Sequence, residues 1–191
     1  SGMAGGSSNA ATFILCVKEI FGLKISSGFN ELLLSLGADV PFCYYRKTAL
    51  VRGIGENIKF IGKLKEYFIL LINPMFEVST EEMFKGLRFD KNKITHQKEK
   101  LSNVLNEKIF INKSNDLEFC AVKKYKIIGE ILSCLSNYKG AVLSRMSGSG
   151  ATCFALFENN NDLDKAKILA KNNFKDCWIK SARLMNNVRD I

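Results

Sequence analysis

The pattern of hydrophobic and polar positions divides the first third of the chain into two helices and two strands. Hydrophobic residues at helical spacing predict an amphipathic helix with Ser7 or Ser8 as its N-cap and Gly22 at its end. A shorter helix precedes Gly37, which we expect in the left-handed conformation that ends many helices. The predicted elements are helices over residues 9–21 and 29–36 and strands over residues 49–52 and 58–61.

The segment GADVPF, which follows the second helix, is predicted to be a short, stiff turn. Proline lacks a backbone N–H and restricts the residue before it, so Pro41 is expected to prevent further helix and to favour extended geometry at Val40. Asp39 then lies on a rigid turn in apolar surroundings. Such an aspartate either caps a turn or serves as a catalytic base or an orienting group for a substrate hydroxyl.

From residue 67 onward the pattern predicts a strand, helices, two strands, a helix and a last strand, which is the order of a ferredoxin-like fold with helices on one side of an antiparallel sheet. Ser79 and Glu82 have capping-box spacing, and Asn115 or Asp116 is expected to cap one long helix. The predicted elements are strands over residues 67–73, 140–144, 152–157 and 178–184, and helices over residues 80–86, 115–135 and 163–171.

The domain organisation follows from these elements. The polar tract from Asp90 to Lys113 is a linker, an irregular helix or an insertion. We expect an α+β chain with a partial first domain over residues 1–66 and a complete second domain over residues 67–191.

Composition narrows the class of protein. With 191 residues, 47% of them hydrophobic, the chain has enough material for one large or two small domains. No apolar run approaches the roughly 18 residues of a membrane span, and the first residues do not resemble a secretion signal, so we expect a cytoplasmic protein without membrane contact. The six cysteines are each isolated in the sequence, and the chain has one histidine, His96. We expect most of the cysteines to be small buried hydrophobic residues in a reducing compartment, and no metal held by the chain alone.

The formal net charge of +9 suits either a polyanionic partner or a lysine-rich surface. The lysines of FDKNKITHQKEKLSNVLNEK alternate with Asn, Gln and Glu and lack interleaved aromatic residues, which favours a solvated surface over a nucleic-acid stripe. A phosphorylated small molecule suits the charge equally well. We therefore expect a small-molecule partner and no nucleic acid.

The first residues, SGMAGGSSNAAT, form a run of small side chains in front of a helix. Such a loop lets backbone N–H groups approach a phosphate, and the helix N-terminus adds about half a positive charge. A flexible tail is the alternative, although the continuation into a helix argues against it. The loop lacks the lysine of G-x-x-x-x-G-K-[ST], which excludes a P-loop, and a Rossmann fingerprint is unsupported.

A second run of small residues lies in RMSGSGATCF, between two predicted strands. An ordinary hairpin loop explains it, because glycine and serine are common turn residues. Together with the first loop, it also suits a clamp on the two sides of a phosphate chain.

Three segments in this order, GMAGGSSNAAT, LGADVPF and RMSGSGATCFALF, resemble motifs of the GHMP kinase superfamily, which includes galactokinase, homoserine kinase and mevalonate kinase. NPMFEVSTEEMF and NDLE are similar to the branch that phosphorylates a cytidine-diphosphate-linked methylerythritol. The resemblance covers nearly the whole chain. It implies part of a ribosomal-S5-domain-2-like domain followed by a ferredoxin-like GHMP kinase C-terminal domain, in a monomer or homodimer.

The resemblance also implies the residues of the site. ATP would bind with Mg²⁺ on the loop of Ser1, Gly2, Met3, Ala4, Gly5, Gly6, Ser7 and Ser8, with Ser8 as the candidate contact to magnesium. Asp39 would be the catalytic aspartate, and the substrate would contact Thr80, Phe84, Ser147, Gly148, Ser149, Gly150 and Ala151, with Phe84 against the cytosine ring. Met3 and Ala4 stand where the family more usually has Leu-Gly, and alanine adopts positive φ less freely than glycine.

The implied activity is ATP-dependent phosphorylation of the substrate's 2-hydroxyl in non-mevalonate isoprenoid biosynthesis. Members of the family carry a segment ahead of the loop with a lysine that acts in the transfer, so we expect this chain to be an N-terminally truncated, inactive form. The alternatives are another GHMP small-molecule kinase and a non-catalytic nucleotide- or RNA-binding module.

Overall fold

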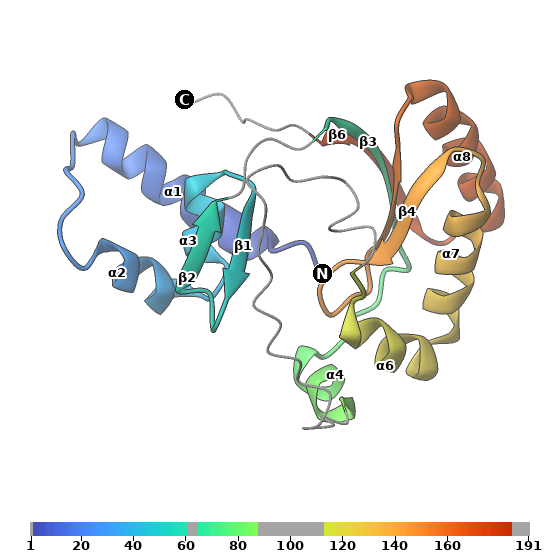
Figure 1. Cartoon of the computed structure of the whole chain (residues 1–191), viewed down its shortest axis with the longest axis horizontal. Coiled ribbons are helices and arrows are strands. Elements are labelled where there is room, and N and C mark those ends of the chain that lie inside the picture. Colours follow the sequence, from blue (N-terminus) through green and yellow to red (C-terminus); the bar gives the residue numbers. More distant parts are fainter. Residues whose placement is uncertain (1, 61–64, 88–112, 185–191) are drawn as a thin grey trace. The chain divides into compact units, whose positions relative to one another are not determined.

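The computed structural model describes residues 2–60, 65–87 and 113–184. They form two compact units (Figure 1): a helical unit of residues 4–60, and a sheet unit of residues 2–3, 65–87 and 113–184. His96 and all of the polar tract except Lys113 lie outside the described residues. None of the described helices is long and apolar enough to cross a membrane.

The helical unit consists of three helices and a β-hairpin. Ala11, Leu33, Val40 and Tyr44 form its buried centre, where α1 packs mainly against α3. The predicted helix over residues 29–36 is confirmed, as is the first strand of the hairpin, and the second strand begins one residue early. The elements are α1 (Gly5–Ile20), α2 (Phe29–Leu36), α3 (Val40–Tyr45), β1 (Ala49–Arg52) and β2 (Asn57–Phe60), with the two strands antiparallel.

Helix α1 begins at Gly5, so the prediction of Ser7 or Ser8 as its N-cap is wrong. Ala4 is the N-cap, in the left-handed conformation (φ 47°, ψ 34°), and both serines belong to the first turn. Two glycines and two serines are weak helix formers, so local propensity did not reveal this turn. Packing of the α1 face around Ala11, which is 1% exposed, stabilises the longer helix.

The predictions for the turn around Asp39 are also partly wrong. Gly37 adopts φ 154° and ψ 151° instead of the left-handed helical conformation, and Val40 and Pro41 begin helix α3 instead of an extended segment. Proline is tolerated there because the first N–H groups of a helix have no partner within it. Asp39 is the N-cap of α3 and is exposed, and its side chain makes no cap hydrogen bond.

The sheet unit has the predicted ferredoxin-like topology. Its antiparallel strands lie in the order β4-β5-β3-β6, and α7 and α8 cover one face of the sheet (Figure 1). Leu70, Ile72 and Phe157 point from that face into a core that Ile131 and Leu135 of α7 complete. The elements are β3 (Tyr67–Asn73), α4 (Thr80–Gly86), α6 (Asp116–Lys124), α7 (Lys126–Asn137), β4 (Ala141–Met146), β5 (Cys153–Phe157), α8 (Asn160–Asn173) and β6 (Trp178–Leu184).

The single long helix predicted from Asn115 is wrong, because the chain breaks at Tyr125 (φ −124°, ψ 92°) into α6 and α7. The two helices then approach closely, since a Cβ added at Gly129 would lie 3.0 Å from Cγ1 of Val122. The Tyr125 ring packs on Phe76, with ring centroids 4.9 Å apart. These tertiary contacts favour the break over the continuous helix that local propensity predicted.

Candidate active site

The first turn of α1 presents backbone N–H groups in open surroundings. The first N–H groups of a helix have no partner within it, and no side chain of the described residues caps this end of α1. A Cβ added at Gly5 or Gly6 would meet no atom within 4 Å. Because the helix dipole adds positive potential there, the turn is suited to hold an anion such as a phosphate.

Ala4 keeps the backbone geometry that this turn needs. Its φ of 47° lies in the region that favours glycine, at a cost of about 1 kcal/mol for an L-residue. Its carbonyl oxygen accepts a hydrogen bond from the backbone N–H of Ser8 (2.8 Å), which closes the first turn. The helix therefore starts directly after Ala4.

The turn that carries Asp39 lies against the first turn of α1. A Cβ added at Gly37 would be 3.9 Å from Oγ of Ser7, and Asp39 is the N-cap of α3, the main packing partner of α1. The helical unit thus brings together two stretches that are 30 residues apart in the sequence, the Gly5–Ser8 turn and the turn before α3.

The charge of Asp39 affects the thiol of Cys43, which lies one helical turn further along α3. Burial, and then the negative charge of Asp39, raise the pKa of the Cys43 thiol. The carboxylate therefore lies near Cys43, which stays a neutral thiol at pH 7 and adds no competing negative charge.

In the sheet unit, residues 147–151 form the loop between β4 and β5, which we call the serine–glycine loop. Ser147 Oγ donates a hydrogen bond to the carbonyl oxygen of Gly2 (2.5 Å). Thr80 Oγ1 and Ser149 Oγ share another hydrogen bond (2.9 Å), so the predicted substrate residues on α4 and on the loop are direct neighbours.

The glycines of this loop are required by its shape. Gly148 and Gly150 have φ of 55° and 92°, a region in which side chains are strained, and Ala151 is fully buried. Gly2, at φ 83°, packs so closely that an added Cβ would lie 2.6 Å from the carbonyl oxygen of Ser147.

An open groove of about 550 Å³ runs beside the serine–glycine loop. Phe84, Ser147 and Gly148, all predicted substrate residues, line it, and the Phe84 side chain is exposed. An aromatic ring beside backbone polar groups is suited to bind a flat base. The groove is also lined by Leu87, Asn115, Met146 and Phe154.

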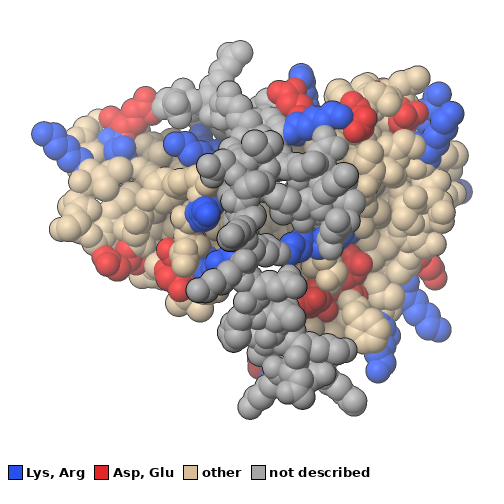
Figure 2. Space-filling view, in the orientation of Figure 1, with Lys and Arg blue, Asp and Glu red and all other residues tan. Residues whose placement is uncertain are grey.

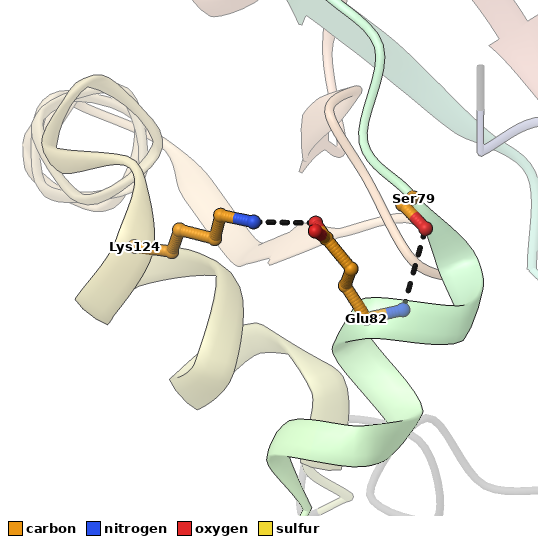
Figure 3. Close-up of polar contacts among 3 residues, drawn as sticks. All are labelled: Ser79, Glu82 and Lys124. Carbon is orange, nitrogen blue, oxygen red and sulfur yellow. Dashed lines mark hydrogen bonds and ion pairs between the residues drawn. The ribbon is translucent and has the colours of Figure 1, made fainter.

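Helix α4, which carries Thr80 and Phe84, is fixed at its start (Figure 3). Ser79 Oγ accepts a hydrogen bond from the backbone N–H of Glu82 (3.3 Å), which confirms the predicted cap. The Glu82 carboxylate pairs with Lys124 of α6, and this hydrogen bond raises the pKa of the lysine. The pair connects α4 to α6, whose N-terminal end reaches the serine–glycine loop.

Three polar side chains to which the sequence analysis gave no site role hold the ends of this loop. Asn115 Nδ2 donates to the carbonyl oxygens of Met146 (2.9 Å) and Gly148 (2.8 Å), and Glu118 Oε2 accepts from the Met146 N–H (2.7 Å). Asn73 Nδ2 donates to Thr152 Oγ1 (2.8 Å). The one feature of the sequence that could have revealed Asn73 is its place as a polar residue at the end of an apolar strand. Asn115 was expected only as a helix cap.

A buried thiol lies at the end of the loop. Burial raises the pKa of Cys153 to about 12, with the carboxylate of Glu118 as the second cause. Cys153 is therefore an uncharged core residue and not a nucleophile.

The predicted site residues thus fall into two sets, each within one unit. The helical unit holds Asp39 and the turn from Ala4 to Ser8, while Ser1 lies outside the described residues. The sheet unit holds Gly2, Met3, Thr80, Phe84 and the whole serine–glycine loop. Among the described residues no group of three or more His, Cys, Asp or Glu is arranged to hold a metal ion.

Comparison with known proteins shows similarity to small-molecule kinases. The family model described as GHMP kinases C terminal matches residues 100–174. A homoserine kinase from Cytophaga hutchinsonii has the same fold, with a TM-score of 0.64 at 15% identity over 98% of this chain and 66% of that one.

The chain is also similar in sequence to kinases that share one name. A 4-diphosphocytidyl-2-C-methyl-D-erythritol kinase from Clostridium kluyveri is 36% identical over 187 residues. A solved 4-(cytidine 5'-diphospho)-2C-methyl-D-erythritol kinase has a TM-score of 0.73 at 23% identity, over 95% of this chain and 66% of that one. The match to the Clostridium kluyveri protein covers 94% of this chain, and this chain spans 65% of that protein's length.

Proposed function

We propose that this protein takes part in the ATP-dependent phosphorylation of the 2-hydroxyl of 4-diphosphocytidyl-2-C-methyl-D-erythritol, a step of isoprenoid biosynthesis. The observation that carries the proposal is the placement of the Asp39 turn against the first turn of α1, with Gly37 beside Ser7. The turn that carries Asp39 thus lies beside a helix end suited to bind phosphate, which supports Asp39 as the base for phosphoryl transfer to an alcohol.

The residues of the helical unit supply the phosphate site and the base. The free N–H groups at the start of α1 hold the ATP phosphates, and open space at Gly5 and Gly6 suits their close approach. Ser8, exposed on the first turn, would contact a Mg²⁺ ion bound with ATP, and such an ion would supply neutralisation of the phosphate charge.

Asp39 orients the acceptor hydroxyl and accepts its proton. The acceptor oxygen forms a bond to the γ-phosphorus while the bond from that phosphorus to the β,γ-bridging oxygen breaks, and its electron pair leaves with ADP. The exposed carboxylate is available for this role because it makes no cap hydrogen bond in α3.

The sheet unit supplies the acceptor site. Phe84 offers an aromatic face to the cytosine ring, and Thr80 and the serine–glycine loop offer hydroxyl and backbone groups to the diphosphate. We propose the expected division into domains, 1–66 for ATP and 67–191 for the acceptor, as the functional one. The proposed location is the cytoplasm, where the six free cysteines would stay reduced.

The test uses the full-length gene product, assayed for ADP release with the cytidine-linked acceptor, homoserine or mevalonate. Turnover is expected with the cytidine-linked acceptor alone. Asp39→Asn should lower kcat by roughly 10²- to 10⁴-fold while ATP binding stays unchanged. Glu19→Gln, which removes an exposed acid near the other end of α1, is the control and should keep normal turnover.

Three outcomes contradict this proposal. Preferred turnover of homoserine or mevalonate would assign another acceptor, and normal turnover of Asp39→Asn would remove the proposed base. Salt-dependent RNA binding without ATP affinity would favour an RNA-binding module.

On the visible face, outside the grey atoms, Lys and Arg are interspersed with Asp and Glu over each unit (Figure 2), which does not favour RNA binding.

A further inference from the structure

The N-terminal turn of α6 holds both polar groups of one residue at the end of β4. Glu118 accepts a hydrogen bond from the Met146 N–H (2.7 Å), and Asn115 donates one to the Met146 carbonyl oxygen (2.9 Å). The same amide nitrogen of Asn115 donates to the carbonyl oxygen of Gly148 (2.8 Å), inside the serine–glycine loop. Three hydrogen bonds therefore join the first turn of α6 to a segment about 30 residues away in the sequence.

The side chain of Asn115 also caps helix α6. Its Oδ1 accepts a hydrogen bond from the backbone N–H of Leu117 (3.0 Å), which caps α6. Serine, threonine or aspartate would serve equally well as a cap. Asparagine differs from them because its amide combines an acceptor with two N–H donors, so one side chain can begin the helix and hold the loop.

The loop needs such contacts to keep one shape. Gly148 and Gly150 have positive φ and no side chains, so local steric restriction of the backbone between β4 and β5 is weak and contacts with other elements have to supply the rest. Asn115, Met146, Ser147 and Gly148 also line the groove beside Phe84, so a change in loop shape changes the groove directly.

We propose that Asn115 and Glu118 are positioning residues that set the conformation of the serine–glycine loop and thereby the place of the acceptor in the groove. The inference rests on the proposed function for the role of the groove. It assigns the two outer residues of NDLE to loop geometry and to no direct contact with the reacting atoms.

The first test compares two matched variants of the full-length protein, Asn115→Ser and Asn159→Ser. Asn159 also caps its helix, α8, by accepting from the Asp162 N–H (2.9 Å), and its Nδ2 donates to the Asp162 carboxylate instead of to the loop. Both variants keep a hydroxyl cap. Asn115→Ser is expected to lower kcat/KM for the acceptor on the order of 10- to 100-fold, because small misplacement of a bound substrate is costly. Equal kcat/KM in the two variants would overturn the inference.

The second test separates loop positioning from a role of charge at Glu118. Glu118→Gln keeps an oxygen that accepts from the Met146 N–H and is expected to keep most of the activity, whereas Glu118→Ala loses the acceptor and should resemble Asn115→Ser. A Glu118→Gln variant as inactive as Glu118→Ala would contradict a positioning role and point to a need for the negative charge.

Amide hydrogen exchange tests the inference without any activity. Asn115→Ser should speed exchange of the N–H groups of residues 146–150, while Asn159→Ser should leave them unchanged. Unchanged exchange in Asn115→Ser would overturn the assignment even in an active kinase. Faster exchange in a protein that phosphorylates no acceptor would support the loop contacts and reject the proposed function. If Asn115→Ser does not fold, Asn115→Asp, which also keeps the cap, replaces it in both measurements.

Discussion

Together with burial, the charge of the Asp39 carboxylate raises the pKa of Cys43, a neighbour that the sequence pattern did not predict. Because residues 40–45 are helical, Cys43 follows one turn after Asp39, and its backbone N–H donates to the Asp39 carbonyl oxygen (3.0 Å). An extended segment at Pro41, as the sequence predicted, would have moved the two side chains apart. The choice of Asp39 as a candidate came from the motif, but its electrostatic surroundings came from helix α3.

This neighbour allows a test of the Asp39 geometry by pH. Burial and the Asp39 charge raise the pKa of Cys43 above its ordinary 9.0, so folding favours the neutral thiol, and this contribution to stability is present below pH 9.0 and lost as the pH rises. Asp39→Asn should lower the pH midpoint of Cys43 alkylation, followed by mass spectrometry. The exposed Cys16 on α1 is the control and should show the same profile in both proteins. An unmoved Cys43 midpoint would place the carboxylate elsewhere.

Elements with strong local signals match their predictions, and elements defined by packing do not. Helix α4 starts at its predicted cap, Ser79, and strand β3 has its predicted bounds because its apolar run ends abruptly. Strand β6 also has its predicted bounds. In contrast, the first turn of α1 and the break at Tyr125 have no cap or proline to mark them. Contacts with other elements decide both.

The cap of α4 gives a prediction at this scale. Ser79→Ala removes the acceptor for the Glu82 N–H and is expected to lower the free energy of unfolding by about 1 kcal/mol, measured by urea denaturation. Ser136→Ala is the matched control. It makes the same chemical change at an exposed position near the end of α7 and should stay within about 0.5 kcal/mol of the original protein. Equal losses in the two variants would argue against the cap.

At the scale of the whole molecule, the chain joins residues that are far apart along it. Gly2 packs against the serine–glycine loop. Its hydrogen-bond partner there, Ser147, is 145 residues away in the sequence. Residues 2–3 thus belong to the sheet unit, although the chain enters the helical unit at Ala4. A glycine at position 2 is required by close approach and by φ, and neither is visible in the local pattern.

Replacement of this glycine should therefore destabilise the protein. Gly2→Ala places a Cβ 2.6 Å from the carbonyl oxygen of Ser147 at a φ of 83°, and we expect a loss of about 1–3 kcal/mol in the free energy of unfolding. Gly6→Ala, in the open first turn of α1, is the control and should stabilise by up to about 1 kcal/mol. The opposite signs are measured by thermal and urea unfolding, and a neutral Gly2→Ala would contradict the close approach.

The amino-acid sequence by itself determined the order of elements in the sheet unit, the cap of α4 and the motifs that suggest a kinase, because periodicity, capping and short motifs are local properties of the chain. The tertiary structure decided where α1 begins, that Val40 and Pro41 open a helix, and that α6 ends before Tyr125. It also decided that Asn115 reaches Met146 and Gly148, 31 and 33 residues away. Such contacts depend on how the ferredoxin-like topology returns β4 to the start of α6, so spacing along the chain alone cannot reveal them.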